Sequence, residues 1–269
     1  MRFALDVYRR LLAVQIRAQL QYPVAFALDL GGTALILIVE FGSLALILQR
    51  FEGIGGWSLV EVAFLYGMVE MAFNTMDMLF SGFDPPVFGR LVRQGQFDQL
   101  LLRPLGITLQ VLGSRCEIRR LGRVAQGGLI FMLAVGLVDV RWTLLKLVYL
   151  PVVFASVVSF LGGLFIIGST ITFWTVESIE AINVLTYGGH EMMTFPMTIY
   201  NDWLRRFFTF IVPAIFLNYY PALYFLDKPD PFNLPPFAPF LAPLAGGGIL
   251  AASLAFWRFG IRHYASTGS

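Results

Sequence analysis

Six long apolar stretches divide the chain, and each approaches the length of a membrane-spanning helix. A bilayer core about 30 Å thick requires about 20 predominantly apolar residues in helical conformation. The candidate spans are residues 24–48, 58–81, 120–138, 146–174, 176–196 and 240–260. The fourth is long enough to tilt, whereas the fifth is the most polar because it contains Glu177, Glu180 and His190. We therefore predict an all-α polytopic membrane protein with six transmembrane helices.

The residues before the first span follow a different pattern. Apolar side chains recur at helical spacing at Phe3, Val7, Leu11, Val14 and Ala18. Arginines and Asp6 occupy the opposite side of the same helix. A basic amphipathic helix of moderate hydrophobicity lies along a membrane surface rather than across it. We predict an N-terminal interfacial helix over residues 2–20, ended by Pro23, and no cleavable signal sequence, because this segment has no compact apolar run.

A further apolar stretch, residues 207–226, is interrupted by two prolines and Asn218. It can form either a kinked seventh span or a pair of short helices that enter the membrane and return on the same side. Basic residues decide between them, because Lys and Arg accumulate on the cytoplasmic side of membrane proteins. With six spans and a cytoplasmic N-terminus, 13 of the 19 basic residues are cytoplasmic; the six outside are Arg50, Arg141, Lys146, Arg205, Arg206 and Lys228. A seventh span would place Arg258 and Arg262 outside, so we predict a re-entrant helical hairpin before the last span and cytoplasmic termini.

A short basic segment, residues 84–104, separates the second span from the third. Asp84 followed by Pro85 is a helix-start pattern, and Gly95 is a stop signal. We predict a helix of about ten residues between them and a second short helix from Gln96 to Arg103. An ordinary cytosolic loop whose arginines contact anionic lipid also fits the charge. The bounded helix favours a shaped docking surface.

Composition supports the membrane assignment and narrows the chemistry. The chain of 269 residues is 57% hydrophobic and 13% charged. One cysteine excludes a disulfide framework and a cysteine metal cluster, and two histidines leave little for a histidine metal site. No G-x-x-x-x-G-K-[ST] sequence is present, so we expect no ATP hydrolysis by this chain. His190 and Glu191 begin a zinc-protease motif, but Thr194 stands where its second histidine would be. We predict neither a catalytic nor a metal site.

Two stretches carry a resemblance to a known family. They are QGQFDQLLLRP at 94–104, after the second span, and FPMTIYNDWLRRFFTFIVPAIFLNYYPAL at 195–223. Both resemble the ABC-2 type permeases, in particular the sub-group described as ABC-2 family transporter proteins, and the likeness covers nearly the whole chain. It implies a single transmembrane domain over 1–269, with a cytosolic interfacial helix at 1–22, a cytosolic coupling region at 82–119 and an external re-entrant region at 197–239.

The resemblance also implies a function. It implies the permease subunit of an ATP-driven exporter in a bacterial inner membrane, carrying a lipid-like, glycan or drug-like cargo. In that family the loop after the second span fits a cleft of a separate ATPase, which makes candidates of Phe88, Arg90, Arg93, Phe97, Asp98 and Arg103. Two ATPase copies, which bind ATP and Mg, and a second permease, identical or related, would complete the complex. The chain itself then needs no cofactor, and its remaining partner is membrane lipid, not nucleic acid.

Acidic residues interrupt the first two predicted spans. Asp29 and Glu40 lie about 20° apart around an ideal helix, and Glu70, Asn74 and Asp77 recur at positions i, i+4 and i+7. A carboxylate within a bilayer is costly unless it is protonated, hydrogen-bonded or facing water. Glu40, Glu70, Asn74 and Asp77 therefore either line a conduit for a cationic or hydroxyl-rich cargo, or form bonds between packed helices. We favour the packing interpretation for Asp29.

Small residues recur in the fourth span at Ala155, Ser159 and Gly163. This spacing permits close approach of two helices, within the chain or between subunits. Two other classes of protein compete with the transporter. A membrane-embedded enzyme would need a catalytic cluster that the sequence does not offer, and a non-transporting sensor or scaffold subunit would share the same fold.

Overall fold

The computed structural model describes residues 2–21, 23–50, 53–118, 120–175 and 180–265. Over these residues the chain is helical, apart from turns and an isolated bridge between Ile54 and Trp57. The longer helices are α1 (Arg2–Leu20), α2 (Pro23–Arg50), α3 (Leu59–Phe80), α7 (Arg120–Leu137), α8 (Leu144–Thr175) and α13 (Ala242–Arg262). The shorter elements are η1 (Ser81–Phe83), α4 (Pro85–Arg93), α5 (Gln96–Leu101), α6 (Ile107–Ser114), α9 (Glu180–Asn183), η2 (Val184–Gly188), α10 (Gly189–Met193), η3 (Met197–Ile199), α11 (Asp202–Arg206), η4 (Phe207–Ile211), η5 (Ala214–Phe216), α12 (Tyr219–Phe225) and η6 (Ala238–Phe240).

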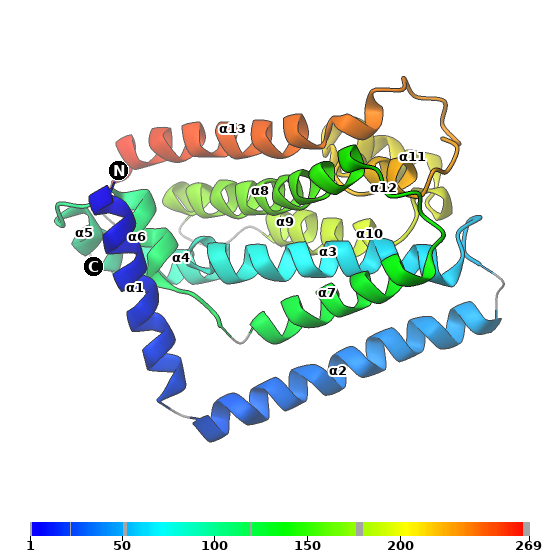
Figure 1. Ribbon diagram of the computed structural model, residues 1–269. Coiled ribbons are helices and arrows are strands. Elements are labelled where there is room, and N and C mark those ends of the chain that lie inside the picture. The colour runs from blue at the N-terminus through cyan, green and yellow to red at the C-terminus, as the bar shows by residue number, and fades with distance from the viewer. Residues whose placement is uncertain (1, 22, 51–52, 119, 176–179, 266–269) are drawn as a thin grey trace.

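The long helices form a bundle with different structures at its two ends. Figure 1 shows α3, α7, α8 and α13 side by side, with α2 along one edge. α4, α5 and α6 gather beside α1 at one end, which also holds the last turns of α13, and we call this the platform end. α11 and α12 gather at the other end, beside the first turns of α3, α8 and α13, and we call this the hairpin end.

The bundle is built from two helix pairs. α8 packs most extensively against α13, and α3 against α7. A Cβ added to Gly246 of α13 would lie 2.3 Å from the backbone oxygen of Ser156 in α8, and one added to Gly163 would meet Ile249 at 2.9 Å. Small residues let helices approach this closely. The predicted close contact of Gly163 is therefore confirmed, and its partner is α13 of the same chain.

Four stretches are long and apolar enough to cross a membrane, among the described residues. They are 59–93, α7, α8 and 238–262, and the bent pair formed by 202–211 and 214–225 would be a fifth if it were one span. α2 coincides with the predicted first span, although many of its side chains lie outside those that the structure describes. An all-helical polytopic membrane protein is thus supported, and the count of six spans stays a prediction.

The fifth predicted span, 176–196, is only partly described by the structure and stays a prediction. Residues 176–179 lie outside the described residues, and from Glu180 to Met193 the helix contains a π-helical segment, Val184–Gly188. These 14 helical residues rise about 21 Å at 1.5 Å each, which is shorter than a bilayer core of about 30 Å. The described part of this segment is therefore too short to cross as a helix by itself.

The segment 198–228 starts and finishes at the hairpin end. Thr198 Oγ1 donates to the carbonyl of Gly55, before α3, at 2.9 Å. Lys228 Nζ lies 2.8 Å from Glu61 Oε1 in the first turn of α3. Both ends of the segment thus adjoin the start of α3, and the bent pair between them, which turns through 79°, returns to the end of the bundle from which it departs.

Candidate functional site

The boundaries of the basic segment agree closely with the prediction. α4 begins at Pro85 and ends at Arg93, and α5 begins at Gln96. Gly95 between them has φ +64°, a left-handed conformation that glycine adopts without steric cost. One detail was wrong: the Asp84 side chain makes no capping hydrogen bond. Proline at the first helical position, which needs no amide partner, is therefore the local feature that starts α4.

Two of the predicted docking residues belong to the core. Phe88 and Phe97 are 0% exposed, and their rings meet at 5.6 Å between centroids. Both also pack against Phe173 of α8 and Trp257 of α13. A side chain with no exposed surface cannot contact another protein, so the prediction that Phe88 and Phe97 bind a partner directly is corrected. They fasten α4 and α5 to the bundle instead.

The other predicted docking residues lie at the surface. Arg90, Arg93 and Arg103 are exposed, and Asp98 is half-buried. Leu102 was missed by sequence reasoning, and it is 86% exposed immediately after α5. The signal was the run of three leucines at 100–102, because consecutive residues of one helix cannot all face the same core. The segment 90–103 thus carries three exposed arginines and an exposed apolar side chain, Leu102.

α6 completes the base beneath this surface. Gln110 donates to the carbonyls of Leu100 and Leu105 at 3.1 and 3.0 Å, which holds the loop after α5. Ser169 of α8 donates to the carbonyl of Phe83. Residues 81–114, comprising η1, α4, α5 and α6, form one unit, which we call the docking platform after the docking role predicted from its sequence.

Helix α1, which the sequence predicts to be interfacial, is hydrogen-bonded to the chain that leaves the docking platform. Gln15 donates to the carbonyl of Ser114 at 2.7 Å, and Gln19 accepts from the amide of Ile118 at 3.1 Å. Between these bonds lies Cys116, the single cysteine, whose thiol has its pKa raised by burial and then by the charge of Glu117. The thiolate is thereby disfavoured, so Cys116 serves as a packing residue here.

Glu70 and Asn74 form a buried polar network with α10. Asn74 Nδ2 donates to Glu70 Oε2 at 2.9 Å and to the Glu70 carbonyl at 2.8 Å. His190 Nε2 lies 3.0 Å from Glu70 Oε1, and its ring packs on Phe73 with centroids 4.0 Å apart. Glu191 Oε1 lies 3.6 Å from His190 Nδ1. Sequence reasoning noted His190 as a polar residue but did not pair it with Glu70.

Asp77 lies about two turns beyond Glu70 along α3 and pairs with α7. Arg120 Nη2 lies 2.7 Å from Asp77 Oδ2, and Glu117 also contacts Arg120. The structure therefore supplies a basic partner to a carboxylate that lies in a predicted span. Glu40 lies in α2, but its side chain and that of Asp29 lie outside those that the structure describes.

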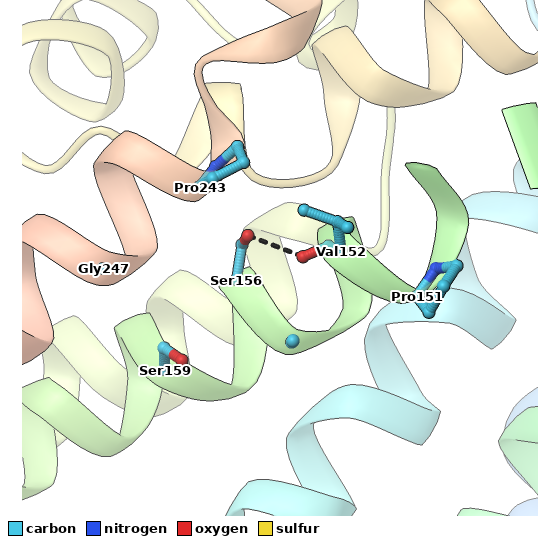
Figure 2. A pocket seen from close by; sticks show the side chains of 7 residues that line it. Pro151, Val152, Ser156, Ser159, Pro243 and Gly247 are labelled. Carbon is cyan, nitrogen blue, oxygen red and sulfur yellow. Dashed lines mark hydrogen bonds between the residues drawn. The ribbon is translucent and has the colours of Figure 1, made fainter. Parts of the chain in front are cut away.

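A groove between α8 and α13 is lined mainly by small residues (Figure 2). It has a volume of about 350 Å³, and the labelled side chains of Ser159, Val152 and Pro243 face it from the two helices. The Ser156 hydroxyl donates its hydrogen bond to the carbonyl of Val152 within α8, at 2.7 Å. Ala155, the other small residue of the predicted stripe, also lines the groove and is exposed.

The described residues offer no cluster of three or more His, Cys, Asp or Glu side chains that could hold a metal ion. His190 and Glu191, which begin the incomplete protease motif, take part in the network around Glu70. The features that remain for function are the docking platform, the two buried acidic networks and the groove.

Comparison with known proteins shows the family to which the chain belongs. The family model described as "ABC-2 family transporter protein" matches residues 34–268, which includes the docking platform, the bundle and the hairpin end. No curated protein and no solved structure matches the chain. Because the match covers most of the sequence, the chain belongs to the ABC-2 family transporter proteins, the membrane-spanning permease components of ABC transporters.

Proposed function

We propose that this permease is one subunit of an ATP-driven exporter whose separate ATPase docks on residues 84–104. The observation that carries the proposal is the docking platform. It is a short basic surface fixed rigidly to the bundle by Phe88 and Phe97, and it exposes Arg90, Arg103 and Leu102. Binding hot spots combine an apolar anchor or arginine with a rigid base, and these residues supply both.

The complex that we propose contains two ATPase subunits, which bind ATP and Mg, and a second permease, identical or related. Cargo crosses where the two permeases meet. Lipid-like, glycan and drug-like cargoes fit equally, and a bacterial inner membrane is the compartment that the family favours. The residues 207–226 form a re-entrant hairpin on the outer side, which the return of 198–228 to the hairpin end supports. Both termini are then cytoplasmic.

The role of Glu40, Glu70, Asn74 and Asp77 as conduit residues is also a proposal. The burial of Glu70, Asn74 and Asp77 between helices of one chain favours the alternative, in which they stabilise helix packing. A conduit role would require these side chains to face water in another conformation. Glu70→Gln would then change transport more than it changes stability.

Docking can be tested by co-expressing this chain with a candidate ABC ATPase and measuring their co-purification. Leu102→Asp and Arg90→Glu are both surface changes and should each weaken assembly by about tenfold or more, since hot-spot residues contribute about 2 kcal/mol or more and about 1.4 kcal/mol is a tenfold change. Arg141→Glu is the matched control, because Arg141 is exposed in the loop before α8 at the hairpin end. Failure of the unaltered chain to co-purify would contradict the proposed function, and normal assembly of both variants would remove the platform surface from docking.

The competing classes predict different results. A membrane-embedded enzyme would convert a substrate without ATP, and a sensor or scaffold subunit would bind the ATPase without ATP-dependent transport. The complex can be reconstituted in vesicles with ATP and Mg, and the ATP-dependent loss of lipid-linked or drug-like probes from the loaded side can be measured. This assay separates a transporter from an enzyme and from a sensor or scaffold subunit.

A further inference from the structure

Trp257 lies near the end of α13 and is the centre of the aromatic cluster at the platform end. Its side chain is 0% exposed. Its ring lies 5.1 Å from that of Phe83, 5.3 Å from that of Phe88 and 5.3 Å from that of Phe173, measured between centroids. Aromatic pairs at these separations attract one another beyond simple area burial. One side chain of α13 is thus packed against η1, α4 and α8 together.

The same side chain also reaches the rest of the docking platform. Its indole Nε1 donates to Thr108 Oγ1 in α6 at 3.0 Å, and its ring lies 6.2 Å from that of Phe97 in α5. Tyr264, just beyond α13, adds a second contact to Phe97 at 4.9 Å. Every helical element of the docking platform therefore contacts Trp257, which belongs to a helix far away in the sequence.

α13 has the properties of a helix that moves as a rigid unit. It is one continuous helix from Ala242 to Arg262, and between Ile249 and Phe259 it contains neither glycine nor proline. Beyond that stretch Gly260 lies so close to α8 that an added Cβ would meet Thr170 Cγ2 at 2.6 Å. A displacement at its platform end must therefore be carried along its length rather than absorbed locally, because packed interiors deform little.

We infer that Trp257 is the positioning residue that couples movement of the docking platform to α13. This inference rests on the proposed function, because the movement originates in an ATPase that docks on the platform. The alternative is that the covalent connection from α3 through η1 carries the movement alone. In that case Trp257 would be an ordinary core residue, and α13 would not follow the platform.

The experiment uses spin labels in the reconstituted complex of permease and ATPase, with ATP and Mg as the only ligands. The distance between labels at Gln99 on α5 and Ala251 on α13 reports whether the platform and α13 move together. The distance between labels at Leu133 on α7 and Ala251 reports whether α13 moves at all. All three positions are exposed. In the unaltered chain, ATP trapping should change the Leu133–Ala251 distance and leave the Gln99–Ala251 distance unchanged.

Trp257→Leu should uncouple the two elements. The ratio of moved to unmoved α13 populations should fall by about 2- to 30-fold, the range seen for residues that carry coupling between sites, while the complex still assembles and hydrolyses ATP. Trp257→Phe keeps an aromatic ring but loses the hydrogen bond to Thr108, so it should give an intermediate ratio. This variant keeps the test possible if Trp257→Leu fails to fold. Trp203→Leu is the matched control, because Trp203 is 70% exposed at the hairpin end.

Two results would overturn the inference. One is an α13 that stays fixed against α7 in the unaltered chain while Gln99 moves. The other is a Trp257→Leu or Trp257→Phe variant that moves α13 as fully as the unaltered chain does. Loss of the proposed function has a different signature, since the unaltered chain would then fail to bind the ATPase at all.

Discussion

The contact between Glu70 and His190 allows a quantitative test of how α10 is held against α3. Glu70→Gln keeps an oxygen that can accept the bond from Asn74 and replaces the carboxyl group that contacts His190. His190→Gln removes the other partner. Together with the double variant they form a double-mutant cycle, which isolates the energy of the pair from the other effects of each substitution.

The expected magnitude follows from burial and distance. Both residues are almost fully buried, at 9% and 5% exposed, and the atoms are 3.0 Å apart. Hydrogen bonds to charged groups contribute about 1.5–3 kcal/mol, whereas neutral bonds between membrane helices average about 0.6 kcal/mol. We expect an interaction energy of about 1.5–3 kcal/mol, because the carboxyl group and the imidazole ring are in contact at a buried site where water screens them little.

The measurement is the unfolding free energy of each variant by detergent titration in mixed micelles. The pair of Asp202 and Arg205 on α11 is the control within the same chain, because the Asp202 side chain is 75% exposed. Its cycle should give about 0.3–0.5 kcal/mol, as exposed helix pairs do. If the Glu70–His190 cycle gave no more than this control, the buried network would not be what holds α10, and its assignment from the geometry would be refuted.

Two further predictions concern packing and a second buried charge. Gly246→Leu should destabilise the protein by about 1–3 kcal/mol or more, because the new side chain would collide with Ser156. Gly247→Leu is the control and should be nearly neutral, since nothing lies within 4 Å of a Cβ added there. Thermal unfolding of the two variants compares their stabilities. Asp227→Asn should lower the unfolding free energy more than Lys146→Met does. The Asn variant leaves Lys146, which is 3% exposed, as an uncompensated buried charge, whereas the Met variant leaves the Asp227 carboxylate, which is 56% exposed. Equal losses of unfolding free energy in a detergent titration would contradict this asymmetry.

The sequence determined the features that depend on neighbouring residues. Apolar length predicted the helices that became α2, α3, α7, α8 and α13, because a chain in lipid must satisfy its own backbone hydrogen bonds and does so as helix. Pro85 and Gly95 fixed the limits of α4 for equally local reasons, since one restricts φ and the other permits a left-handed turn.

Only the tertiary structure decided which side chains face a partner and which face the core. Phe88 and Phe97 stand on an amphipathic segment whose two sides the sequence could not assign, and Trp257 of α13 determines that they point inward. Asp77 and Glu70 contact Arg120 and His190, respectively, which lie on other helices. A pattern along one helix reports its polarity but not the neighbour that covers it, because contacts between distant segments exist only once the helices have packed.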